Sequence, residues 1–271
     1  MTRTMQTENF PVGSWLVAAP LRPVVHAYYR FARIADDIAD SSDLAPDDKI
    51  GRLDALDAEL MGGPGDGPAS QIRDLLAERN VPIDHCRDLL VAFKRDSATP
   101  RTRDWADLMT YCRYSAAPVG RFLLDLHGES RETWPANDAL CAALQVLNHL
   151  QDCGDDYRVL DRVYLPGDLL AAHGAAIEDL AAGSSSPALA RVLADTVELT
   201  RPLVRQARDL PGRIADGGLR RETAVIVAIA ERLLAKLAGR DPLAERIELG
   251  KVDYAAAALA GLGRSLFGSG R

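Results

Sequence analysis

Apolar side chains recur at helical spacing along most of the chain, and this periodicity most limits the folds open to it. Between residues 21 and 41 they fall on one helix face, and the same spacing returns in later segments. No useful length alternates apolar and polar residues as a half-buried strand would. Ala and Leu, both strong helix formers, supply most of the 47% hydrophobic content, and aromatic residues make up only 6%. We therefore expect an all-α protein.

Pro, Gly and Ser divide the chain of 271 residues into segments of helical length. The breaker-rich loops at 62–68 and 182–187 are short and no internal repeat is visible, so we expect one domain over residues 1–271. Residues 104–126 predict one long helix, capped by Asp104 and kinked at Pro118. An extended segment is expected before Pro166. The other predicted helices cover residues 21–41, 47–60, 69–79, 84–94, 136–159, 187–212, 219–238 and 252–267.

The charge balance argues against nucleic acid as a partner. The net charge is -7, whereas nucleic-acid binding draws its affinity from Lys and Arg on phosphates. The four cysteines stand singly without C-x-x-C spacing, so neither a zinc site nor a disulfide framework is predicted. The first residues lack the apolar run of a signal peptide. We expect a protein of the reducing cytoplasm.

The C-terminal segment "DYAAAALAGLGRSLFGSGR", residues 253–271, is apolar and partly amphipathic. It predicts either an ordinary last helix packed on the protein or a helix lying on a membrane surface. No apolar stretch in the chain is long enough to cross a bilayer. Peripheral membrane contact is therefore left open.

The stretch "RFARIADDIAD", residues 30–40, places three aspartates at the end of an apolar helix face. Asp36 and Asp40 are one helical turn apart and point the same way, so they repel each other by roughly 0.2–0.5 kcal/mol when solvated. A divalent cation shared by the two carboxylates would offset the repulsion. A solvated helix end is the alternative for this cluster taken alone.

A second polar row lies in the helix predicted at 136–159. Asn148, Asp152 and Asp156 are spaced i, i+4 and i+8 after the apolar run "LCAALQVL". Polar groups on a buried stretch need cations or hydrogen-bond partners. If the two rows face each other they surround one cavity with oxygen ligands, which favour magnesium or manganese over zinc.

The two motifs together resemble one known family. "YYRFARIADDIAD" at 28–40 and "NHLQDCGDDYRVLDRVYLP" at 148–166 are similar to the aspartate-rich motifs of the head-to-head trans-prenyl synthases, which include squalene, phytoene and presqualene diphosphate synthases. The resemblance covers almost the whole chain. It implies an all-α isoprenoid synthase fold with a central cavity, in which the two motifs hold Mg²⁺ against a prenyl diphosphate substrate.

The resemblance also implies roles for individual residues. Tyr111 would lie beside the reacting carbons, and Tyr29, one turn before Arg33, would be a further catalytic residue, although each could instead be an ordinary core tyrosine. Arg33 would contact the diphosphate, with an ion pair to Asp37 as the alternative. Further diphosphate contacts are implied for Arg162, Tyr164, Asn9, Phe10 and Ser14, and metal binding for Asp36, Asp37, Asp40, Asn148, Asp152 and Asp156.

One departure from the family pattern bears on the substrate. Gln151 stands where many members have an arginine, which argues against a second diphosphate. With "ENFPVGSWLVAAPLRP", "YCRYSAAPVG" and "NHLQDC", it gives a resemblance to the bacterial branch that makes hydroxysqualene for hopanoids. This implies a lyase acting on presqualene diphosphate and water, within reach of other squalene-pathway enzymes. A synthase condensing two farnesyl diphosphates, with or without NADPH, and a non-catalytic scaffold homologue are the alternatives.

Overall fold

The computed structural model describes residues 18–98 and 101–267. Within these ranges the chain forms α-helices and short 3-10 helices, and its only β-type pairing is an isolated bridge between Arg101 and Val163. The all-α prediction is confirmed. The elements are η1 (Ala19–Leu21), α1 (Arg22–Asp40), α2 (Pro46–Leu60), α3 (Pro68–Arg79), α4 (Asp84–Ala98), α5 (Trp105–Ser115), α6 (Ala117–Leu126), η2 (Arg131–Thr133), α7 (Trp134–Leu160), α8 (Gly167–His173), η3 (Ile177–Ala181), α9 (Pro187–Ala207), α10 (Leu210–Arg213), α11 (Gly217–Leu237) and α12 (Lys251–Phe267).

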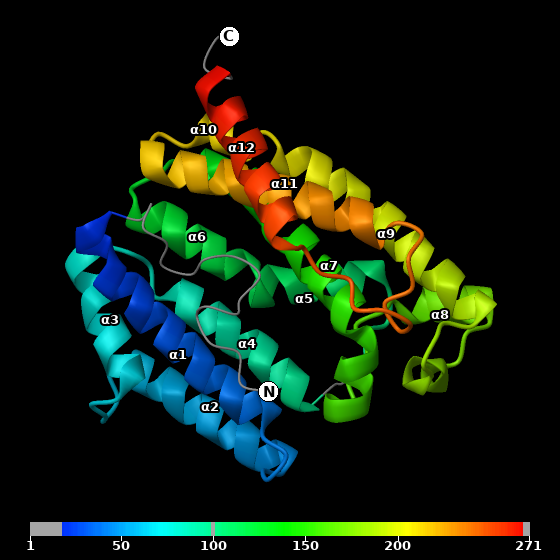
Figure 1. Ribbon diagram of the computed structural model, residues 1–271. Coiled ribbons are helices and arrows are strands. Elements are labelled where there is room, and N and C mark those ends of the chain that lie inside the picture. The colour runs from blue at the N-terminus through cyan, green and yellow to red at the C-terminus, as the bar shows by residue number, and fades with distance from the viewer. Residues whose placement is uncertain (1–17, 99–100, 268–271) are drawn as a thin grey trace.

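Helices α1 to α4 form one side of the molecule, drawn in blue and cyan in Figure 1, and α6 packs against them. Their shared core is built from fully buried side chains such as Phe31, Leu53 and Ile72. The rings of Tyr28 and Phe122 stack with centroids 4.0 Å apart, which joins α1 to α6. This packing fixes the direction in which α1 presents its aspartates.

The second core surrounds α7, which packs against α9 and α11 (Figure 1). Leu147 of α7, Val192 of α9 and Ala230 of α11 are fully buried within it. Helix α12 lies across α11, where a Cβ on Gly261 would come within 2.7 Å of the Ala224 backbone. The close contact is therefore possible only with glycine.

Several predicted boundaries were wrong. The long helix expected at 104–126 is two helices, because Ala116 leaves helical geometry at φ -120° and ψ -47°. Pro118 then sits in the first turn of α6, where its missing N–H costs nothing. The helix expected at 187–212 ends at Ala207 and α10 is separate, α4 continues four residues beyond 94, and α8 and η3 were not predicted.

The last helix is present, and Ala257 on its inner face is fully buried against α11. Its outer face carries Val252 and Leu259, which are 82% and 75% exposed. None of the helices in the described ranges has the length and apolar character needed to cross a bilayer. All four cysteines are free thiols, in line with the sequence. The single domain over residues 1–271 stays a prediction.

Candidate active site

A cavity of about 270 Å³ lies between the two cores. Side chains from α1, α6, α7 and α11 line it, with Leu210 of α10 closing part of the wall. Most of the lining is apolar, as with Val25, Leu144 and Ile226. The central cavity predicted from the family resemblance is thus present.

Helix α1 carries one row of residues along this cavity. Val25, Tyr29 and Ala32 line the wall, and Asp36 and Asp40 continue the same helix face one and two turns further. The successive steps are 4, 3, 4 and 4 residues. The aspartates therefore follow directly where the apolar wall of α1 ends.

Helix α7 repeats this pattern with the same steps. Cys141, Gln145 and Asn148 line the cavity, and Asp152 and Asp156 continue the row. The last turns of α1 and α7 lie close together: Arg162, two residues after the end of α7, donates hydrogen bonds to Asp40 and to the Ala39 carbonyl at the end of α1. Both carboxylate pairs are therefore at one end of the cavity, as the two-cluster prediction requires.

Two arginines contact the aspartates of α1. Arg33 bonds to Asp36 at 2.6 Å and to Asp37 at 2.7 Å, so its expected pairing with Asp37 is present. The Arg162 guanidinium, only 6% exposed, donates to the Asp40 carboxylate at 2.6 Å and to the Ala39 carbonyl at 3.0 Å. These arginines supply the positive charge that offsets repulsion among the carboxylates.

The arginine charges do not fully offset the burial and carboxylate repulsion at Asp36. Burial and the negative charge of Asp40 raise the pKa of this carboxyl from 3.8 to about 7, against the lowering effects of Arg33 and Arg162. Further positive charge at this position would favour the ionised form. The oxygen-only donors fit Mg²⁺, which keeps several waters and accepts phosphate oxygens. No three His, Cys, Asp or Glu side chains within the described ranges form a ready-made ion cage, so water and substrate oxygens would have to complete the shell.

Asp96, at the end of α4, is a further carboxylate that accepts hydrogen bonds from two tyrosines. The Tyr111 hydroxyl donates to one Asp96 oxygen at 2.8 Å, and the Tyr164 hydroxyl donates to the other at 3.0 Å. Loss of hydration raises the pKa of Asp96, although Arg162 and the two tyrosines act in the opposite direction. Burial, followed by the Asp96 charge, raises the pKa of Tyr111, which keeps this phenol protonated.

His149 joins this cluster to the row on α7 that is predicted to bind metal. Its ring stacks on Tyr164 with centroids 3.6 Å apart, and its Nδ1 lies 3.6 Å from the Asp156 carboxylate. Gln145 contacts the other ring nitrogen at 3.1 Å. The rings of Tyr111 and Tyr164 are 5.1 Å apart, so an aromatic wall stands beside the carboxylates.

The structure places the other predicted residues as follows. Tyr29 lines the cavity, whereas Tyr111 is buried beside Asp96 and is absent from the described lining. The Gln151 amide donates to the Ile247 carbonyl, on the segment between α11 and α12, which turns it away from a diphosphate role. Asn9, Phe10 and Ser14 lie outside the described residues.

Sequence reasoning missed Asp96 and His149. The predicted helix at 84–94 ended before Asp96, and the surrounding "FKRDSA" has no motif to mark it. The hydrogen bonds that distinguish this aspartate come from α5 and from the segment after α7. His149 stands inside the second motif, but its stacking on Tyr164 is a tertiary contact that no spacing predicts.

Comparisons with known proteins identify the family of the chain. The squalene/phytoene synthase family model matches residues 4–253. A hydroxysqualene synthase of Rhodopseudomonas palustris is 48% identical over 99% of this chain and 94% of its own length. A hydroxysqualene synthase of Zymomonas mobilis is 43% identical, covering 92% of this chain and 84% of its own. The predicted resemblance to this branch is confirmed.

Solved structures support the same conclusion. A squalene synthase from Alicyclobacillus acidocaldarius is 33% identical with a TM-score of 0.74, covering 84% of this chain and 87% of that one. A dehydrosqualene synthase, 18% identical, has a TM-score of 0.81 over 96% of this chain and 93% of its own, a likeness of fold alone. With the family model matched across most of its length, the chain belongs to the squalene/phytoene synthase family.

Proposed function

We propose that this enzyme converts presqualene diphosphate and water to hydroxysqualene and diphosphate. The observation that carries the proposal is the pair of rows on α1 and α7, each passing from cavity wall to carboxylates with the same spacing. An apolar prenyl chain would fill the cavity while its diphosphate lies at the carboxylate end. The choice of this branch rests on relatives named hydroxysqualene synthase at 43% to 48% identity.

The carboxylate end would hold the leaving group. Asp36, Asp37, Asp40, Asn148, Asp152 and Asp156 would bind Mg²⁺, which when present neutralises diphosphate charge and helps the C–O bond to ionise. Arg33 and Arg162 already lie against these carboxylates. When substrate binds, each guanidinium can turn a donor to a diphosphate oxygen, because a guanidinium carries five donors. Tyr164 and the N-terminal residues Asn9, Phe10 and Ser14 complete the proposed diphosphate contacts.

Tyr111 and Tyr164 would position the attacking water. Because the Tyr111 and Tyr164 hydroxyls both donate to Asp96, their oxygens are left to accept a hydrogen bond. Tyr111 is not itself among the described lining residues, so the water would stand between its phenol and the cavity, donating to Tyr111 and turning its lone pair toward the rearranged carbocation. The new C–O bond forms from that lone pair, and the surplus proton passes through Tyr111 to Asp96. Tyr29, on the cavity wall, would stabilise the cation through its ring.

The proposed location is the cytoplasm, with peripheral contact to a membrane. The substrate and product each carry a thirty-carbon chain, so both partition into bilayers. Enzymes that supply presqualene diphosphate and consume hydroxysqualene are then the natural neighbours of this one. Nucleic acid has no part in the proposal.

Isotope labelling tests the proposal directly. The purified protein receives presqualene diphosphate and Mg²⁺ without NADPH in ¹⁸O water, and the products are read by mass spectrometry. We expect hydroxysqualene with the heavy oxygen in its hydroxyl. A product formed only with NADPH, or an unlabelled alcohol, would contradict water capture.

One solved relative is named a squalene synthase. The alternative reaction for this chain is therefore the condensation of two farnesyl diphosphates. Gln151 argues against it, because its amide is engaged by Ile247. A parallel reaction with farnesyl diphosphate alone decides between the two. Consumption of farnesyl diphosphate, with presqualene diphosphate left untouched, would replace the proposed substrate, and turnover of neither would leave a scaffold homologue.

A further inference from the structure

One end of the molecule carries a charge opposite to that of the whole chain. Residues 201–221 hold six arginines and two aspartates, with no lysine or glutamate, in a chain of net charge -7. They span the last turns of α9, which lie beside residues 231–235 of α11, then all of α10 and the start of α11 (Figure 1). We call this region the arginine end. Its arginines are Arg201, Arg205, Arg208, Arg213, Arg220 and Arg221.

Three of the six arginines have a carboxylate partner: Arg201 contacts Glu198 at 2.6 Å, Arg208 contacts Glu231 at 2.6 Å, and Arg213 lies 3.9 Å from Asp209. Two other acidic groups nearby are bound to the backbone. Asp216 accepts from the Leu219 N–H at 2.7 Å, and Glu129 accepts from the N–H groups of Ala215 and Asp216 at 2.7 Å each. Arg205 and Arg221 are exposed, and across the described part of the chain no carboxylate pairs with either. The positive charge that the arginine end presents to its surroundings therefore comes mainly from Arg205 and Arg221.

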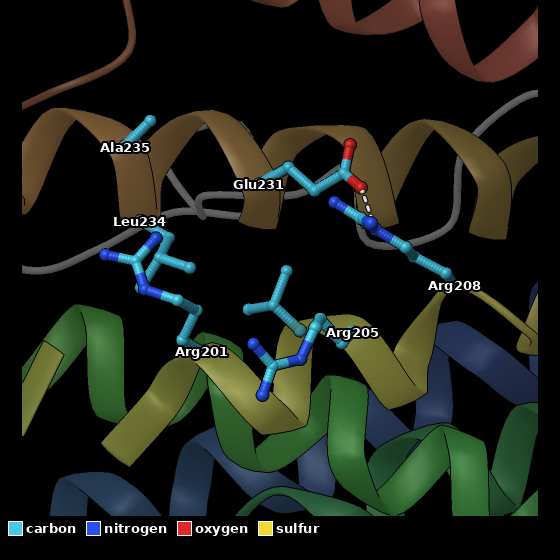
Figure 2. Close-up of a pocket in the computed structure, with 7 residues that line it drawn as sticks. Arg201, Arg205, Arg208, Glu231, Leu234 and Ala235 are labelled. Carbon is cyan, nitrogen blue, oxygen red and sulfur yellow. Dashed lines mark hydrogen bonds and ion pairs between the residues drawn. The ribbon is translucent and has the colours of Figure 1, made fainter. Parts of the chain in front are cut away.

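Figure 2 shows a pocket of about 210 Å³ between α9 and α11 within this region. Arg201 and Arg205 of α9 line it together with Arg208, the residue that follows α9, and the Arg208 guanidinium donates to Glu231 of α11 at 2.6 Å. Val204 and Leu234 form an apolar floor. Guanidinium groups around an apolar floor suit a phosphate with hydrocarbon attached, because arginine stems pack on apolar surface while their heads bind phosphate.

The arginine end also adjoins the cavity. Leu210 of α10 and Leu219 of α11 belong to the cavity lining. Helix α10 packs against η2, immediately before α7 begins, whereas the aspartates of α7 lie near its other end. The cavity thus runs from the carboxylates to the foot of the arginine end.

We propose that the arginine end docks on an anionic phospholipid bilayer, so that the hydrocarbon end of the cavity opens toward the membrane. The part played by the product rests on the proposed function. A thirty-carbon alcohol with one hydroxyl leaves an apolar cavity for a bilayer rather than for water. Phosphate headgroups are the anions that such a surface presents over the breadth of α9, α10 and α11, and each arginine near them strengthens binding.

Vesicle flotation of the full chain measures the docking. Phosphatidylcholine vesicles, with and without phosphatidylglycerol, are compared at low and at physiological salt. We expect binding to require phosphatidylglycerol and to weaken with salt. Equal binding to both kinds of vesicle would overturn the proposal.

A matched pair of variants locates the surface. Arg205→Gln/Arg221→Gln removes two unpaired charges of the arginine end and should lower vesicle affinity by about 30-fold. The control Arg52→Gln/Arg191→Gln removes the same charge from exposed sites on α2 and on the far end of α9, and should bind as the wild type does. An equal loss in both variants would show general charge attraction and refute the assignment.

Two further outcomes would also refute it. Loss of vesicle binding in Val252→Gln/Leu259→Gln, with normal binding by the arginine variant, would move the contact to α12. Loss of inorganic phosphate binding in the arginine variant, measured by calorimetry with vesicle binding unchanged, would show a small-anion site instead.

Turnover in detergent separates this inference from the proposed function. Presqualene diphosphate in neutral micelles should be consumed equally by the wild type and by Arg205→Gln/Arg221→Gln, since neither arginine contacts the carboxylate end. If presqualene diphosphate is turned over but vesicle binding does not depend on phosphatidylglycerol, the docking proposal is refuted and the proposed reaction stands. Vesicle binding without turnover removes the proposed reaction, and with it the reason for product transfer.

Discussion

Asp36 and Asp96 are both aspartates with raised pKa values, yet their partners differ in kind. Asp36 contacts Arg33 and stands one turn from Asp40, so charge surrounds it. Asp96 accepts hydrogen bonds from two phenol hydroxyls, which are neutral donors, and the charge of Arg162 acts on it without a hydrogen bond. A carboxylate among charges is suited to holding cations, and one among hydroxyls is suited to accepting a proton. The contrast assigns different tasks to the same residue type within one site.

The largest expected effect comes from removing negative charge at the carboxylates proposed to bind Mg²⁺. Asp36→Asn or Asp152→Asn keeps the shape of the side chain but loses its negative charge, so turnover should fall by about 1000-fold or more. EDTA, which removes Mg²⁺, should abolish turnover by the wild type in the same assay. Asp47→Asn, an exposed change in the first turn of α2, is the control. Near-normal turnover by Asp36→Asn at limiting Mg²⁺, with an unchanged melting temperature, would break the comparison.

Asp96→Asn should have an intermediate effect on rate. Loss of the proposed proton acceptor should lower kcat by about 100-fold, while KM for presqualene diphosphate stays close to that of the wild type because the carboxylates of α1 and α7 are unchanged. Steady-state kinetics with labelled substrate measure both. A rise in KM with kcat unchanged would make Asp96 a binding residue and remove the distinction from Asp36.

The raised pKa of Asp96 also predicts a pH dependence of stability. Its folded-state pKa lies above the ordinary value of 3.8, so its contribution to stability is fully present below that value and is lost as pH rises through the raised pKa. The free energy of unfolding of the wild type, relative to Asp96→Asn, should therefore decrease as pH rises above about 4. Urea titrations in EDTA at several pH values measure this difference. A difference that grows with pH would contradict the raised pKa.

The smallest expected effect separates the two hydroxyls on Asp96. Tyr111→Phe removes the proposed water contact and should lower formation of ¹⁸O-labelled alcohol by roughly tenfold, about the value of one hydrogen bond. Unquenched cation should then appear as elimination products. Tyr164→Phe also removes one donor to Asp96, but should leave the ratio of alcohol to elimination products closer to that of the wild type. The opposite ranking would transfer the water to Tyr164.

Much of the carboxylate end was predictable from the sequence. The periodicity on either side of Asp36 and Asp152 requires each row to share a helix face, and apolar neighbours require that face to be partly buried. The break at Ala116 was not predictable, because Pro118 is compatible with both a kink and a new helix. Asp96 was hidden for another reason: its partners Tyr111 and Tyr164 are 15 and 68 residues away along the chain. Contacts of that separation depend on tertiary packing rather than on local pattern.

Because the lining residues have the same spacing on α1 and α7, the distance of each one from the carboxylates can be counted in helical turns. Ala32 and Asn148 are the last cavity residues before the carboxylates, and each earlier lining position lies one helical turn, about 5.4 Å, further away. The length of hydrocarbon that the cavity accepts can therefore be counted in turns from Asp36 and Asp152. A bulkier side chain at a given turn would shorten the accepted chain by about one isoprene length and leave the leaving-group chemistry in place. Substrate length and bond cleavage are in this way separately adjustable on the same two helices.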